Sequence, residues 1–124
     1  MTSRILIVDD DGPQRRSLRL GLELAGFEAA AVPSADEALG VLELESFDLA
    51  IVDVMMPGVT GLQLVRRLQF RHADLPVVLT SGYHLARHHL ERIGLNAVAF
   101  VPKPYNLVEL TDFLRLKLKQ RAAC

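Results

Sequence analysis

Five short apolar segments, separated by longer amphipathic segments, limit the folds open to this chain. The apolar segments are rich in Val, Ile, Leu and Ala, and they lie at 5–8, 27–32, 49–52, 76–79 and 98–101. Short apolar runs of this kind are typical of strands that are buried on both faces of a parallel sheet. The segments between them carry apolar residues at helical spacing. We therefore expect an α/β chain with right-handed crossovers and a parallel sheet.

Residues typical of helix ends mark where the intervening helices start and stop. Asp11 and Pro13 suit the cap and first turn of a helix that ends near Gly26. Ser34 and Glu37 have the spacing of a capping box for the next helix. Further helices are expected at 60–70, 85–93 and 107–119. These elements fill the 124 residues, a length that suits one domain.

Composition excludes several classes of protein. Fourteen basic and fifteen acidic residues give a net charge of −1, which offers no electrostatic footprint for nucleic acid or an anionic membrane. The chain has no signal-peptide layout and no apolar stretch near the ~20 residues that span a bilayer. Its single cysteine, Cys124, cannot form an internal disulfide, which favours a reducing compartment. We expect a soluble, cytoplasmic protein.

Chemically active side chains follow the predicted strands. Asp9 and Asp10 come after the first strand, Asp53 after the third, Thr80 after the fourth and Lys103 after the fifth. The carboxyl ends of parallel strands meet at one edge of the sheet, where ligands of such folds bind. We therefore expect these five side chains to converge.

Converging carboxylates need a counter-charge. Two of them about 4 Å apart repel by roughly 4 kcal/mol at an effective dielectric constant near 20. Lys103 relieves this only in part, whereas Mg²⁺ takes oxygen ligands and keeps positions for phosphate oxygens. A carboxylate can also accept a phosphoryl group as an acyl phosphate. Asp53 is the predicted nucleophile because it stands apart from the acidic pair, with Lys103 and Thr80 contacting the phosphoryl oxygens.

Four segments resemble the signatures of bacterial response-regulator receivers. They are Ile-Val-Asp-Asp at 7–10, the run from Asp53 to Gly61, Leu-Thr-Ser-Gly at 79–82 and Val-Pro-Lys-Pro at 101–104. The resemblance implies a flavodoxin-like, doubly wound (βα)5 fold with a parallel five-stranded sheet of order 2-1-3-4-5. It implies one receiver domain over 1–124 with no output domain, although a fragment of a larger regulator or hybrid kinase fits equally. It also implies a phosphoacceptor that assists its own phosphorylation and dephosphorylation, not an enzyme.

The resemblance implies a metal site at matching positions. Asp10, Asp53 and the main-chain carbonyl of Met55 would bind Mg²⁺ or Mn²⁺ directly, and Asp9 would support the ion through water.

It also implies a conformational switch. Thr80 would move onto the phosphoryl group and Phe100 would swing inward with it, although a strand phenylalanine is also an ordinary core residue. Lys103 would bind the phosphoryl group, with a cis bond to Pro104.

The resemblance further implies partners. A histidine kinase or histidine phosphotransfer domain would donate the phosphoryl group, through a surface near the first helix. The signal would leave to an unidentified protein through the face formed by 85–93, 98–101 and 107–119. The last helix carries more apolar residues than one buried stripe needs, so a homodimer through this face is a second route. No nucleic acid or membrane partner is expected.

Two other interpretations compete with this one. The segment from Ile5 to Gly12 also resembles the nucleophile motif of haloacid-dehalogenase-type phosphatases, with Asp9 as nucleophile and Asp11 as acid–base. That alternative leaves Asp53 unexplained. His84 and His88 stand one helical turn apart and suggest zinc, but further ligands are not evident, and solvated histidines are favoured.

Overall fold

The structure is a computed structural model that describes residues 2–54, 61–81 and 99–123. Its strands are β1 (Arg4–Val8), β2 (Glu28–Val32), β3 (Leu49–Asp53), β4 (Val77–Ser81) and β5 (Ala99–Pro102). Its helices are α1 (Gly12–Leu24), α2 (Ala35–Leu44), α3 (Gly61–Arg71) and α5 (Leu107–Ala123). The helix predicted at 85–93 lies outside the described residues, as do the three histidines at 84, 88 and 89. In the described part of the chain, no helix is long and apolar enough to cross a membrane.

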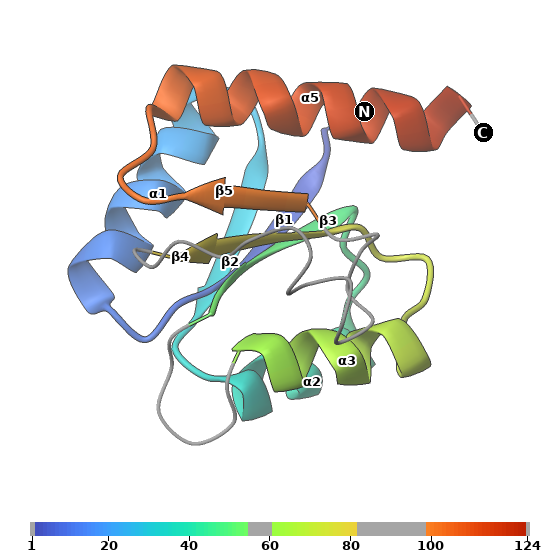
Figure 1. Cartoon of the computed structure of the whole chain (residues 1–124). Helices are drawn as coiled ribbons and strands as arrows, with labels where there is room; N and C mark the ends of the chain where they lie inside the picture. Colours follow the sequence, from blue (N-terminus) through green and yellow to red (C-terminus); the bar gives the residue numbers. More distant parts are fainter. Residues whose placement is uncertain (1, 55–60, 82–98, 124) are drawn as a thin grey trace.

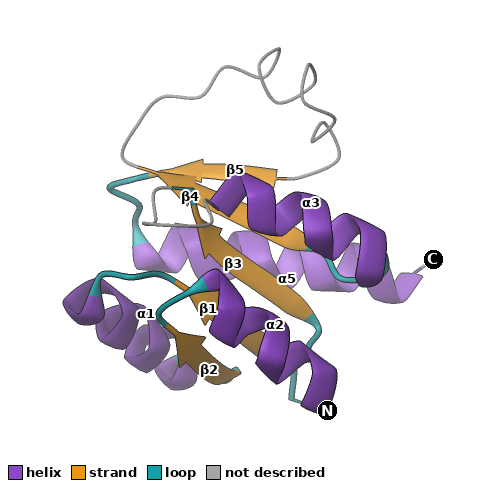
Figure 2. Ribbon diagram, turned by 90° about the horizontal axis from the view of Figure 1, so that it is seen from below, coloured by secondary structure: helices purple, strands orange, loops and turns teal. Residues whose placement is uncertain are grey.

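The strands form one parallel sheet of order β2-β1-β3-β4-β5, which confirms the predicted order. Helices α1 and α5 cover one face of this sheet, and α2 and α3 cover the other (Figure 1). The same layering is seen from below in Figure 2. β1 and β3 therefore lie inside the sheet, with helices above and below them, and their ends mark the place where the predicted acidic residues meet.

Alternation along β1 shows why its residues from Ile5 to Val8 are all apolar. Ile5 and Ile7 join the core under α1 and α5, whereas Leu6 and Val8 join the core under α2 and α3. Successive side chains of a strand point to opposite faces, so a strand covered on both faces needs apolar residues at every position. Polar side chains of such a strand can reach solvent only where the strand ends.

The predicted caps at Asp11 and Ser34 and the predicted helix stop at Gly26 are confirmed, whereas the last helix continues to Ala123, beyond its predicted end at 119. The carboxylate of Asp11 accepts a hydrogen bond from the main-chain N–H of Gln14 (3.0 Å), and the hydroxyl of Ser34 accepts one from the N–H of Glu37 (3.2 Å). Gly26 adopts φ 99°, a left-handed conformation that glycine tolerates without strain. Asp11 therefore both caps α1 and orients its first turn.

The prediction for the fourth strand was too short. It ended at residue 79 with the last apolar side chain, but β4 continues through Thr80 and Ser81. The N–H of Val54 donates to the carbonyl of Thr80 (2.9 Å) and the N–H of Lys103 to that of Ser81 (2.8 Å). Main-chain hydrogen bonds of the neighbouring chain segments extend the strand beyond its apolar run.

Two glycines at contrasting positions test the packing around β3. A Cβ on Gly61 would lie 2.7 Å from the Cα of Val54 and would also collide with the carbonyl of Asp53, whereas a Cβ on Gly40 in α2 would meet nothing within 4 Å. We expect Gly61→Ala to lower the free energy of unfolding by about 1–3 kcal/mol through overpacking. Gly40→Ala should raise it by roughly 0.5–1 kcal/mol, because alanine favours a helix interior. Urea denaturation of both variants measures this, and equal effects of the two substitutions would contradict the assigned packing.

Candidate functional site

Three carboxylates meet at the carboxyl end of the sheet. Asp9 follows β1 directly and is 6% exposed, Asp53 is the last residue of β3 and is 7% exposed, and Asp10 is exposed. One oxygen from each of the three lies within 4.8 Å of those from the other two. The sheet thus brings together acidic residues separated by more than forty positions, as the sequence predicted.

Lys103 extends from the end of β5 into this acidic cluster. Its ammonium nitrogen lies 3.4 Å from Oδ2 of Asp9 and 3.6 Å from Oδ2 of Asp53, and its side chain is 17% exposed. Three carboxylates and one ammonium leave a formal charge of −2. Because both ion pairs are largely shielded from solvent, this excess negative charge is screened less than it would be on the surface.

Main-chain contacts hold the acidic cluster in place. Oδ1 of Asp9 accepts a hydrogen bond from the N–H of Asp11 (2.9 Å), and the guanidinium of Arg15 donates to the carbonyl of Asp9 (2.8 Å). The peptide bond between Lys103 and Pro104 is cis, as the resemblance implied. The two hydrogen bonds of Asp9 tie the loop after β1 to the first turns of α1.

The predicted switch residues occupy different surroundings. Thr80 is buried and pairs with Asp53 across β3 and β4, so their side chains share one face of the sheet. Phe100 is half-buried and packs against the core under α2 and α3. In the strand register Val101, not Phe100, is the β5 neighbour of Thr80. Met55, the predicted source of a main-chain ligand, lies outside the described residues.

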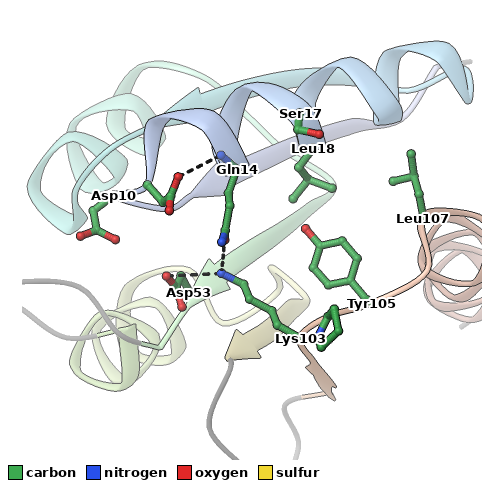
Figure 3. Close-up of a pocket in the computed structure, with 10 residues that line it drawn as sticks. Asp10, Gln14, Ser17, Leu18, Asp53, Lys103, Tyr105 and Leu107 are labelled. Carbon is green, nitrogen blue, oxygen red and sulfur yellow. Dashed lines mark hydrogen bonds and ion pairs between the residues drawn. The ribbon is translucent and has the colours of Figure 1, made fainter.

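Gln14 and Tyr105 also belong to the site, although no motif in the sequence marks them. They line a cavity of about 900 Å³ between α1 and the turn that leads into α5, together with Asp53, Lys103 and Leu107. Figure 3 shows the ammonium of Lys103 between Gln14 and Asp53, with the ring of Tyr105 beside α1. Position was the available signal: Gln14 lies in the first turn after the cap at Asp11, and Tyr105 lies two residues after Lys103.

The donor set of this cluster fits a hard divalent cation. It consists of carboxylate oxygens alone, with no nitrogen or sulfur ligand among the described residues. Such oxygen sets suit Mg²⁺, Ca²⁺ or Mn²⁺. The three acidic side chains Asp9, Asp10 and Asp53 could therefore hold an ion of this class, which would offset the excess negative charge.

The comparison with protein families assigns most of the chain to one class. The model of the response regulator receiver domain matches residues 5–115. This chain belongs to the response-regulator receiver domain family.

Curated relatives support this assignment. The chain is 38% identical over 114 residues to the response regulator protein FleR of Pseudomonas aeruginosa, covering 92% of this chain and 24% of the relative. It is 32% identical over 120 residues to the response regulator MprA of Mycobacterium tuberculosis, covering 97% of this chain and 52% of the relative. The chain thus spans a quarter to a half of these curated relatives. The matches give no support to the dehalogenase-type phosphatase.

Solved structures agree in fold. The CheY-like receiver domain protein of Methanospirillum hungatei superposes with a TM-score of 0.89 at 30% identity, covering 99% of this chain and 98% of the other. The response regulator TrrA of Thermotoga maritima, solved in complex with Mg²⁺ and BeF, superposes with a TM-score of 0.83 at 30% identity. That match covers 94% of this chain and 99% of the other.

The negative charge of the site acts on Tyr105. Burial raises the pKa of its phenol above the usual 10.0, and the carboxylates of Asp9 and Asp53 raise it further. The neutral phenol is thus favoured in the folded protein. The folded state should lose stability as pH rises from 10.0 through the raised pKa, because there the unfolded chain ionises this group more readily.

We expect the difference between the tyrosinate absorbance titrations of the wild type and Tyr105→Phe to have a midpoint above pH 10.0. Asp53→Asn, which removes one of the carboxylates, should move this midpoint down toward 10.0. A midpoint at or below 10.0 in the wild type would show that the phenol is not buried beside the acids.

Proposed function

We propose that this chain is the phosphoacceptor of a two-component system and that Asp53 accepts the phosphoryl group. The convergence of Asp53, two further carboxylates and the ammonium of Lys103 at one sheet edge supports this most directly. The donor would be a phosphohistidine of a histidine kinase or a histidine phosphotransfer domain. This choice of donor follows from membership of the receiver family.

In the proposed reaction, a carboxylate oxygen of Asp53 attacks phosphorus, and the bond between phosphorus and the donor imidazole nitrogen breaks. The electron pair of that bond returns to the imidazole, which takes a proton from solvent, and Asp53 becomes an acyl phosphate. Lys103 is already beside Asp53, so its ammonium would contact a phosphoryl oxygen without a large rearrangement. Thr80, paired with Asp53, would donate a hydrogen bond from its hydroxyl to another phosphoryl oxygen.

The metal site proposed for this reaction uses Asp10, Asp53 and the carbonyl of Met55 as direct ligands, with Asp9 contacting the ion through water. A bound Mg²⁺ would neutralise charge on the phosphoryl oxygens. In the protein alone, Asp9 remains paired with Lys103, and Asp10 remains exposed and open to a ligand.

The proposed output is a two-state shift that begins at Thr80 and Phe100. It would alter the surface near β5 and α5, to which a downstream protein or a second copy of the chain would bind. Val108 and Leu116 of α5 are exposed apolar residues available for such contacts. Sedimentation of the free and phosphorylated chain distinguishes these routes.

We propose that residues 1–124 act as one receiver domain. The cytoplasmic location of the protein stays a prediction.

The position of the acyl phosphate tests the assignment of Asp53. Incubation with acetyl phosphate and Mg²⁺, followed by mass mapping, should place the phosphoryl group on Asp53. Asp53→Asn should lower incorporation at least tenfold, because an amide is a far weaker nucleophile than a carboxylate. Asp74→Asn, at an exposed turn after α3, is the matched control and should label normally. Modification at Asp9 with Asp53 unmodified would falsify the proposal.

The acidic cluster should destabilise the folded protein without metal and stabilise it when Mg²⁺ is bound. Without metal, Asp10→Asn should raise the melting temperature, because it removes one of three like charges. With Mg²⁺, the wild type should be stabilised, and the variant should bind the ion about tenfold more weakly, as expected for loss of a charged contact. Thermal denaturation with and without Mg²⁺ measures both effects, with Asp74→Asn again as control. A variant that gains as much as the wild type from Mg²⁺ would show that Asp10 is not a ligand.

A further inference from the structure

The ammonium of Lys103 makes its shortest contact with an uncharged residue. Nζ lies 2.7 Å from Oε1 of Gln14, compared with 3.4 Å from Asp9 and 3.6 Å from Asp53. An ammonium has three N–H donors and no acceptor. Its contacts with Gln14 and Asp9 are hydrogen bonds, whereas its contact with Asp53 is an ion pair. Figure 3 shows Gln14 reaching from α1 toward the end of Lys103. The two residues are 89 positions apart, so the contact joins α1 to the turn after β5.

The local structure holds Gln14 in this position. Its main-chain N–H donates to the carboxylate of the N-cap Asp11 (3.0 Å), and it lies in the first turn of α1. An amide accepts a hydrogen bond without adding charge. Gln14 can therefore bind the ammonium without adding a fourth negative charge to a cluster that already carries three carboxylates.

We propose that Gln14 is a positioning residue for Lys103. A lysine has a flexible four-carbon stem, and ordering it at the site costs conformational entropy. The hydrogen bond from Gln14 keeps the ammonium beside Asp53 before the phosphoryl group arrives, so that this ordering is complete when the reaction starts. When a phosphoryl oxygen takes one of the three N–H groups, Gln14 still holds another. This inference rests on the proposed function of Asp53.

The alternative role for Gln14 is structural: its contact could simply tie α1 to the turn after β5. A double-mutant cycle separates the two roles. Gln14→Met keeps the length of the side chain and removes the acceptor, and Lys103→Met removes the ammonium. Gln69→Met, the same change at an exposed position near the C-terminal end of α3, is the matched control.

The first readout is the rate of Asp53 phosphorylation by acetyl phosphate with Mg²⁺. We expect Gln14→Met to slow it about 3- to 10-fold, the effect of losing one hydrogen bond of ordinary strength at a solvent-exposed position. In the Lys103→Met background the same substitution should have no further effect, and Gln69→Met should leave the rate unchanged in both. An equal slowing by Gln14→Met in both backgrounds, or no slowing in either, would overturn the proposal.

The second readout does not depend on phosphorylation. In the metal-free protein, the ammonium of Lys103 should give a resolved nitrogen-15 NMR signal that is protected from exchange with water, and Gln14→Met should abolish that protection. If the wild type is not labelled at Asp53, the proposed function fails, and this signal still decides whether Gln14 orders Lys103. An ammonium equally protected in both proteins would overturn the positioning role.

Discussion

Repulsion between carboxylates at the carboxyl edge of the sheet is the constraint around which the site is organised. Asp9 and Asp53 are buried, and Asp10 is close to both. These side chains would separate if the chain around them were free to move. The rigid ladder between β1 and β3 prevents this, and one ammonium offsets only part of the charge. The protein thus keeps an electrostatically unfavourable cluster, and a bound cation would reduce its excess negative charge.

The core explains why the cluster stands at the edge and nowhere else. Every residue of β3 is buried, with apolar side chains directed to the helices on both faces. A carboxylate within the strand would have no partner in that core and would be costly to bury. Asp53 is the last residue of β3, and Gly61 at the start of α3 lies so close to it that a Cβ there would collide with the main chain. The site is therefore the first point along β3 where a charge can be accommodated.

The role of a residue could be predicted from the sequence where that role depends on neighbouring residues in the chain, and not where it depends on distant ones. Asp11 and Gly26 were predicted in their roles because a helix cap and a left-handed turn are local properties of a few consecutive residues. The extent of β4 was underestimated because main-chain hydrogen bonds from β3 and the end of β5 hold Thr80 and Ser81 in the strand. Gln14 and Tyr105 were overlooked because neither an amide nor a phenol marks a site until its neighbours are known.

The sequence by itself determined the order of strands and helices, the two-sided burial of the sheet and the acids and lysine that stand at its strand ends. These follow from periodicity and from the resemblance of short motifs, and both can be read along the chain. Only the tertiary structure decided that Lys103 is shared between Asp9, Asp53 and Gln14. The same holds for Tyr105, whose pKa is raised by the carboxylates of Asp9 and Asp53. The reason is physical: these contacts join the loop after β1, helix α1, the end of β3 and the turn after β5, and their distances depend on how helices pack across the sheet.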